Sequence, residues 1–172
     1  MSLLARLDLE DLSPSGLWAA LDDATRDEAV RSVYKDKQGN GKLEADMAIA
    51  KALRFRPSAV RQLPLERRVS YLLKAVHVDD PLASTLLLAL HLDDRVEILQ
   101  AFLDELGIPQ QDGLIDEGYE LDPPEADALT RAANCIYERF DAPRSDLYLA
   151  ALIALDPVTW GALRSVLTTR GS

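Results

Sequence analysis

Prolines divide this chain into a series of short helices. Proline is favoured in the first turn of a helix, where its missing N–H would have no intrahelical partner, and it disrupts a helix interior. Three prolines directly follow a residue that can cap a helix, in Ser13-Pro14, Asp80-Pro81 and Asp156-Pro157. The prolines that open a stretch of helical periodicity are Pro14, Pro57, Pro64, Pro81, Pro124, Pro143 and Pro157.

The pattern between the prolines predicts an all-α fold. The chain has 172 residues, which suits one domain with a sizeable core, and only 6% of them are aromatic. Short connections imply antiparallel neighbours, so we expect a single compact domain, residues 1–172, of about eight to ten helices packed as antiparallel hairpins, in a helical bundle or a short solenoid-like array. The helices are predicted near 14–22, 25–35, 43–55, 57–62, 64–77, 81–92, 94–106, 124–140, 143–155 and 157–168.

Two of these segments are expected to form the centre of the fold. The helix 81–92 has no charged residue between Leu82 and Leu90, and the stretch 147–155 is equally apolar. A helix that is apolar on every side belongs in a core. We therefore predict that these two elements are the most buried.

Charge is distributed unevenly along the chain. The formal net charge is −10, which argues against general nucleic-acid binding, yet residues 35–74 carry ten basic and four acidic side chains. Arginines with interleaved aromatics are what a phosphate-rich or single-stranded ligand would need. The same arginines could instead neutralise acids of this protein or bind a protein partner. This basic island consists of Lys51, Arg54, Arg56, Arg61, Arg67, Arg68 and Lys74, with Phe55 and Tyr71 among them.

An acidic loop is predicted at residues 108–123, which is also where any sub-domain break is expected. Seven acids and no base occur between Asp112 and Asp127. Like charges on a loop need a counter-charge, and the basic island supplies one, either within the chain or across a dimer. The acids of interest are Asp112, Asp116, Glu117, Glu120 and Asp122, and we expect some of them near Arg54, Arg56, Arg61, Arg67 or Arg68.

Both histidines occur in one repeated phrase, His-apolar-Asp-Asp, preceded by a Leu-rich run and a Pro-Leu pair, which hints at a helical repeat. One interpretation is structural: each imidazole lies in the last turn of a helix, where a positive charge suits the dipole, and the second Asp caps the next helix. The alternative is a metal site, to which imidazoles and carboxylates could contribute together. Against a metal site, the two junctions should lie at opposite ends of a hairpin. The residues concerned are His77, Asp79, Asp80, His91, Asp93 and Asp94.

The stretch from Asp36 to Met47 resembles a calcium-binding loop of the EF-hand family. Asp36, Asn40, Gly41 and Leu43 stand at loop positions one, five, six and eight. The stretch departs from the family pattern at Gln38 and at Met47, which replaces the bidentate Glu that closes the cage. Gly39-Asn40-Gly41 also suits a tight turn between two helices, and we expect no calcium or other cofactor.

The remaining features point away from catalysis. The single Cys135 is expected to be a small core residue in a reducing compartment, and the sequence contains no phosphate loop and no nucleophile elbow. The apolar runs are too short to span a bilayer, so we expect a cytoplasmic protein without membrane contact. The sequence favours a non-catalytic helical interaction or adaptor domain that binds a protein partner or itself. The alternatives are a metal-binding protein or metal-dependent enzyme using His77 and His91, and a phosphate- or nucleic-acid-binding module using residues 51–74.

Overall fold

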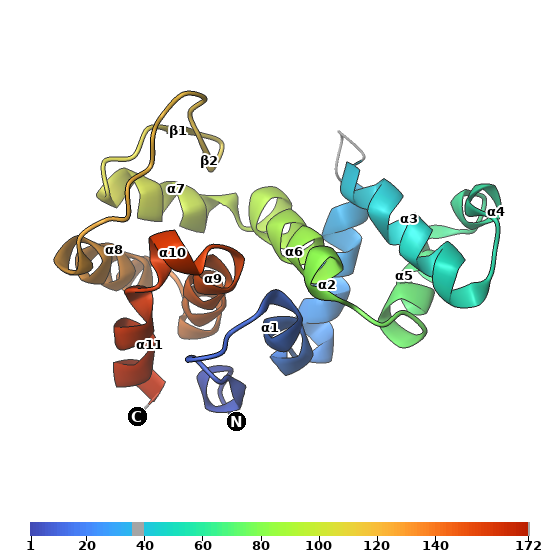
Figure 1. Ribbon diagram of the computed structural model, residues 1–172, viewed down its shortest axis with the longest axis horizontal. Helices are drawn as coiled ribbons and strands as arrows, with labels where there is room; N and C mark the ends of the chain where they lie inside the picture. Colours follow the sequence, from blue (N-terminus) through green and yellow to red (C-terminus); the bar gives the residue numbers. More distant parts are fainter. Residues whose placement is uncertain (36–39, 172) are drawn as a thin grey trace.

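The computed structural model describes residues 1–35 and 40–171, and these residues form an all-α fold, as predicted (Figure 1). A 3₁₀ turn (Leu4–Arg6), a π-helical turn (Leu90–Asp94) and a two-stranded hairpin of β1 (Gln110–Gln111) and β2 (Leu114–Ile115) accompany the helices. The helices are α1 (Pro14–Ala20), α2 (Asp23–Lys35), α3 (Asn40–Leu53), α4 (Pro57–Arg61), α5 (Leu65–Lys74), α6 (Asp80–Ala89), α7 (Val96–Glu105), α8 (Ala126–Arg139), α9 (Ala142–Leu155), α10 (Pro157–Trp160) and α11 (Leu163–Gly171).

The helix starts follow the proline signals closely. Ser13 accepts a hydrogen bond from the backbone N–H of Gly16, and Asp156 does the same for Thr159, so two of the three predicted caps are confirmed. The predicted helix 157–168 is in fact two, α10 and α11. The break falls at Gly161, where a Cβ atom would lie 2.5 Å from the carbonyl oxygen of Pro157.

The prediction for the core is half right. Nine residues of α9 are buried, so α9 lies at the centre of the fold. Helix α6 buries one face against α1, α2 and α3, but Leu88 on its outer face is 46% exposed. The prediction that α6 is buried on nearly all sides is therefore wrong, because its apolar outer face lines a groove on the surface.

Two groups of four helices repeat the same arrangement. In Figure 1, α3, α4 and α5 lie to one side of α6, and α8 to α11 lie to the other side. Within the group α2–α5 the last helix packs against the first two, and the short third helix packs on the second. The group α8–α11 has the same contacts, and its short third helix also begins with a proline. The described helices therefore contain two copies of one four-helix unit.

Corresponding side chains support the repeat. In the first unit, the Tyr34 hydroxyl donates to buried Asp46 at 3.0 Å, and the Arg68 guanidinium lies over the Tyr34 ring. The second unit places Tyr137, Asp146 and Arg170 on the corresponding helices. Tyr137 donates to Asp146 at 2.6 Å, and the Arg170 guanidinium lies 3.5 Å from the centre of the Tyr137 ring. The repeat thus differs from the one hinted at by the two histidine phrases.

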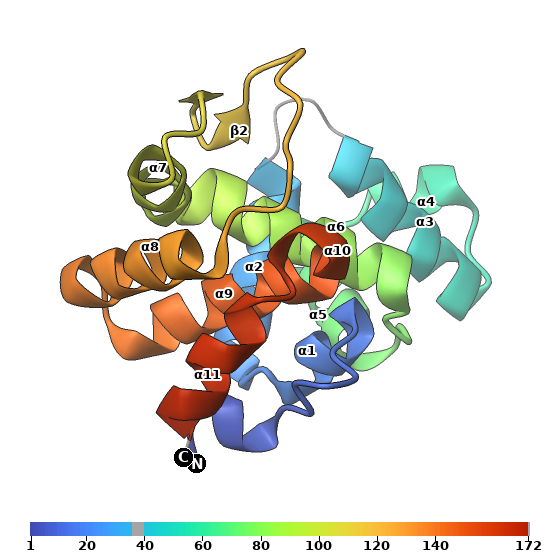
Figure 2. The same cartoon turned by 60° about the vertical axis from the view of Figure 1, so that its left-hand side comes forward.

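The units and their connections form one continuous core. The 3₁₀ turn near the N-terminus contacts α11 near the C-terminus, so the two ends of the chain lie close together (Figure 2). Helices α7 and α8 pack against each other, although the acidic loop separates them in sequence. None of the helices in the described part of the chain is both long and apolar enough to cross a membrane.

Candidate functional site

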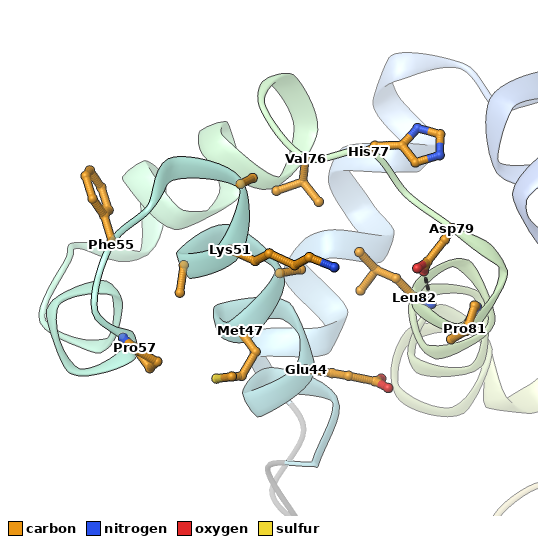
Figure 3. Close-up of a pocket in the computed structure, with 13 residues that line it drawn as sticks. Glu44, Met47, Lys51, Phe55, Pro57, Val76, His77, Asp79, Pro81 and Leu82 are labelled. Atoms are coloured by element: carbon orange, nitrogen blue, oxygen red, sulfur yellow. Dashed lines mark hydrogen bonds between the residues drawn. The ribbon is translucent and has the colours of Figure 1, made fainter.

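A groove runs along the surface between α3 and α6. Its first half, about 830 Å³, lies between the C-terminal half of α3 and the start of α6 (Figure 3). Its second half, about 1020 Å³, continues between the start of α3 and the end of α6, and reaches the β1–β2 hairpin. Glu44 and Met47 line both halves, so we treat them as one feature, the α3–α6 groove.

The walls of this groove are largely apolar and exposed. On α3, Leu43 is 51% exposed and Met47 is 48% exposed, while Ile49 on the opposite face is fully buried. Phe55 and Leu88 add two further large apolar side chains that are more than 40% exposed. Scattered exposed apolar residues are normal on a protein surface, but several gathered along one groove mark an interaction site.

Cations lie at one end of the groove, where Lys51 lines it together with the carboxylates of Glu44 and Asp79. Figure 3 shows the Lys51 side chain extending from α3 into the space between α3 and α6. At the end of α3, Arg54 has a left-handed backbone with φ of 55°, and the N–H of Phe55 closes the turn onto the carbonyl of Ala50 at 2.9 Å. Arg54 and Arg56 flank Phe55 in the sequence at this turn. None of these three cations forms an ion pair with a described residue.

The basic island predicted from the sequence is only partly a surface. Arg54, Arg56, Arg61, Arg67 and Lys74 are exposed. Arg68 is instead held within the fold, where its guanidinium forms an ion pair with buried Asp46 at 3.3 Å. Tyr71 is half-buried and meets Phe55 edge to face, with ring centres 6.3 Å apart. Arg68 is therefore part of the protein interior, and Tyr71 contacts the groove residue Phe55. The spacing of charges along the sequence does not reveal this difference.

The acidic loop contains a hairpin that the sequence interpretation missed. Asp112 and Gly113 both have positive φ, 52° and 80°, as a two-residue Asp-Gly hairpin turn requires. The Asp-Gly dipeptide is a sequence signal for a hairpin turn, but the many acidic residues around it favoured the interpretation as an irregular loop. The hairpin tip, with Asp112 and Leu114, closes the far end of the α3–α6 groove.

The expected pairing of this loop with the basic island within one chain is wrong. Among the described residues, no ion pair joins Asp112, Asp116, Glu117, Glu120 or Asp122 to an arginine. Residues 116–124 lie at the opposite end of the molecule from α4 and α5, with α7 and α6 between them (Figure 1). Pairing across a dimer stays a prediction.

The two histidines lie at opposite ends of α6 and in different environments. His77 is exposed in the connection between α5 and α6, whereas His91 is 4% exposed within the π-helical turn. The ten-residue α6 separates them by about 15 Å along its axis. The described residues include no group of three His, Cys, Asp or Glu side chains that could hold a metal ion. The two phrases therefore do not converge on one metal within this chain.

The aspartates of these phrases also differ from the expectation. Asp79, rather than Asp80, caps α6 by accepting from the N–H of Leu82 at 3.1 Å. Asp80 accepts from the N–H of Ser15 instead and so joins α6 to α1. Asp94 makes no cap for α7, because its carboxylate accepts from Ser32 and pairs with Lys35 at 2.8 Å.

Burial keeps the His91 imidazole neutral. The pKa of His91 is lowered from 6.5 to about 4, mainly because burial disfavours the charged ring. Its Nδ1 lies 2.8 Å from the carbonyl oxygen of Leu87, so Nδ1 carries the proton and donates. Nε2 is buried without a hydrogen-bond partner among the described residues. The expected positive imidazole at a helix end is therefore wrong for His91.

This shift in pKa makes stability depend on pH. Between pH 6.5 and 4 the unfolded chain binds a proton at His91 that the folded chain does not, so folding stability falls as pH falls through this range. The loss at pH 4 amounts to about 3 kcal/mol, from 1.36 kcal/mol per pKa unit. Urea denaturation across this pH range measures it. Arg95 and Glu28, which pair with each other near His91, have opposite effects on the ring.

Two histidine variants distinguish the contribution of His91 from that of carboxylates that titrate in the same pH range. His91→Gln should remove this part of the pH dependence, while His77→Gln, at an exposed position, should retain it. An unchanged profile in His91→Gln would show that the ring is not buried in the neutral form.

The second part of the stretch that resembles a calcium loop is helical in the structure. Residues 36–39, which include Asp36, Gln38 and Gly39, lie outside the described residues. Asn40 to Met47 form the first two turns of α3, and Asn40 and Gly41 are helical instead of part of a tight turn. Since a calcium loop wraps its ligands around the ion, a straight helix at these positions does not provide that geometry.

Comparison with protein-family models, with curated proteins and with solved structures finds no match for this chain.

Proposed function

We propose that this chain is a non-catalytic helical interaction domain whose α3–α6 groove binds an amphipathic, acidic helix of a partner protein. The observation that carries the proposal is the gathering of exposed apolar side chains along the groove, from Leu43 and Met47 to Phe55, beside cations without ion-pair partners among the described residues. Amphipathic helices bind apolar grooves through residues spaced one turn apart.

The internal repeat supports a bound helix at this place. Met47 corresponds to Leu147 in the second unit, where the side chain is 2% exposed, and Lys51 corresponds to Ala151, also 2% exposed. In the second unit this face of α9 is thus covered by the rest of the chain. The first unit leaves the equivalent face of α3 uncovered over 14 residues, about 20 Å, enough for three to four turns of a partner helix.

Charge selects the kind of partner. Lys51, Arg54 and Arg56 favour carboxylates at that end of the bound helix, where they would speed encounter and fix its orientation. The acidic loop of a second copy is the other candidate occupant. Residues 116–125 of that loop form no helix, whereas the uncovered face of α3 suits a helical ligand. We therefore favour a different protein.

A pair of designed peptides tests the proposal. Both form amphipathic helices with the same leucine spacing, but one carries Glu and the other Lys on its polar face. We expect fluorescence anisotropy to show saturable binding of the Glu peptide alone. Reversing the charge with Lys51→Glu should weaken that binding about tenfold, the effect of losing a favourable pair and creating a repulsive one. Met47→Asp should weaken it further, since a charge would enter the apolar wall.

The control is Val158→Asp, which places the same charge on an apolar residue that is 83% exposed and lies outside the groove. This variant should bind the Glu peptide as the wild type does. Equal binding of the two peptides, or no binding of either, would contradict the proposal. A concentration-dependent mass that Met47→Asp abolishes would instead identify a second copy as the occupant.

The other two functions considered from the sequence have less support. A metal-dependent activity would need His77 and His91 together, and α6 keeps them apart. A nucleic-acid module would need a continuous basic face, but Arg68 is bound to Asp46 and large apolar side chains line the groove between the remaining cations.

A further inference from the structure

A second, smaller hollow lies at the other end of α6, away from the cationic end of the groove. It has a volume of about 340 Å³ and is lined by the end of α6, the π-helical turn, α7, the β1–β2 hairpin, α9 and α10. Leucines provide most of its wall, among them Leu99, Leu103 and Leu152, and Trp160 closes one side. This size and composition are those of a site for a small molecule, at the lower end of the usual range.

Three polar side chains interrupt this apolar wall: His91, Tyr148 and Asp156, whose carboxylate already accepts from the N–H of Thr159. His91 and Tyr148 both line the hollow, and their ring centres are 5.5 Å apart. Nε2 of His91 can only accept a hydrogen bond, because Nδ1 holds the proton, and no described residue donates to it. Nor does the Tyr148 hydroxyl form a hydrogen bond with a described residue, and burial raises its pKa, so it keeps its proton.

An unpartnered acceptor of this kind is costly. A buried polar atom without a hydrogen bond loses the one it made to water, and native folds rarely keep such atoms without a reason. The π-helical turn that carries His91 is itself an uncommon structure that occurs frequently at functional sites. The backbone does not need the imidazole, since the carbonyl of Leu87 also accepts from the N–H of Leu90.

We propose that the hollow beside His91 binds a small, uncharged, largely apolar molecule that carries one hydrogen-bond donor, a hydroxyl or an N–H, directed at His91 Nε2. The leucines and Trp160 hold the apolar body of the molecule. Tyr148 offers a second polar contact. A neutral imidazole in an apolar wall does not stabilise an anion, so carboxylates and phosphates are excluded. This proposal does not rest on the partner helix proposed for the groove.

Indole and benzofuran are matched probes for this site. They have the same shape, but indole carries an N–H where benzofuran has an oxygen that cannot donate. We expect saturable binding of indole to the full chain by calorimetry, about tenfold tighter than binding of benzofuran, because only indole satisfies Nε2. The ¹⁵N resonance of His91 Nε2 should shift on addition of indole and remain in place with benzofuran. His77→Gln leaves one histidine and makes the assignment direct.

Two variants test separately the role of the His91 acceptor and the role of the space in the hollow. His91→Leu replaces the imidazole with an apolar side chain of similar size and so removes the acceptor. This variant should bind indole and benzofuran equally. Ala151→Leu fills the hollow from α9 while leaving His91 in place, and should abolish binding of both. Melting each variant alone shows whether it folds.

Three results would overturn the proposal. One is equal affinity of the wild type for the two probes. Another is binding that survives Ala151→Leu in a folded protein. The third is the absence of saturable indole binding up to its solubility limit, which would leave the unpartnered imidazole as a purely structural feature.

Discussion

Replacing Asp46 with alanine should lower the free energy of unfolding by about 3–5 kcal/mol, the cost of leaving one member of a buried ion pair alone. Asp46 is 2% exposed, the Arg68 side chain is 12% exposed, and their charged atoms lie 3.3 Å apart. Without the carboxylate, the guanidinium stays buried over the Tyr34 ring with no counter-charge. Urea denaturation followed by circular dichroism measures the change.

The second unit supplies the matched control. Asp146→Ala removes the carboxylate that accepts from Tyr137, but no ion pair with Arg170 is lost, so the cost should be nearer 1.5–3 kcal/mol, about that of a hydrogen bond to a charged group. Adding Arg68→Met to Asp46→Ala should restore much of the lost stability. Equal costs for Asp46→Ala and Asp146→Ala, with no recovery in the double variant, would contradict a role for the buried charge.

Replacing Phe102 with alanine should be equally severe, at about 3–5 kcal/mol. Phe102 on α7 is fully buried and meets the rings of Tyr148 and Trp160 edge to face, with centres 5.4 and 5.7 Å away. Truncation would leave a cavity where α7, α9 and α10 meet. Thermal and urea denaturation check the size of the effect.

The control for this cavity is Phe55→Ala, which removes the same side chain from a position that is 43% exposed. That change should cost no more than about 1.5 kcal/mol, the upper value for an aromatic contact such as the one with Tyr71. A small effect at Phe102 together with a large one at Phe55 would mean that α7 is not part of the core.

Local signals in the sequence were sufficient for most of the helices. Ser13, Asp141 and Asp156 cap helices through their own side chains and are followed by prolines, so each start depends on only a few neighbouring residues. The hairpin turn at Asp112-Gly113 also depends on neighbouring residues alone, but the acidic composition of the loop hid this signal. These features can be predicted because short-range geometry decides them.

Features decided by packing could not be predicted in this way. His77 and His91 stand in the same local phrase, yet one is exposed and the other is buried, because only the second is covered by α9 and its neighbours. The apolar surface of α6 could equally face a core or a groove. The repeat of the four-helix unit rests on a few corresponding residues, such as Asp46 and Asp146, and the connection between the first two helices differs in length.

Leu88, Leu92 and Leu114 line both the α3–α6 groove and the hollow beside His91. A molecule in the hollow and a helix in the groove would therefore touch the same three side chains. Two binding equilibria that share contacts are thermodynamically linked. If the small molecule changes the affinity for the helix by some factor, the helix changes the affinity for the small molecule by the same factor. With both sites occupied as proposed, the concentration of a small apolar metabolite would set how tightly this chain holds its protein partner.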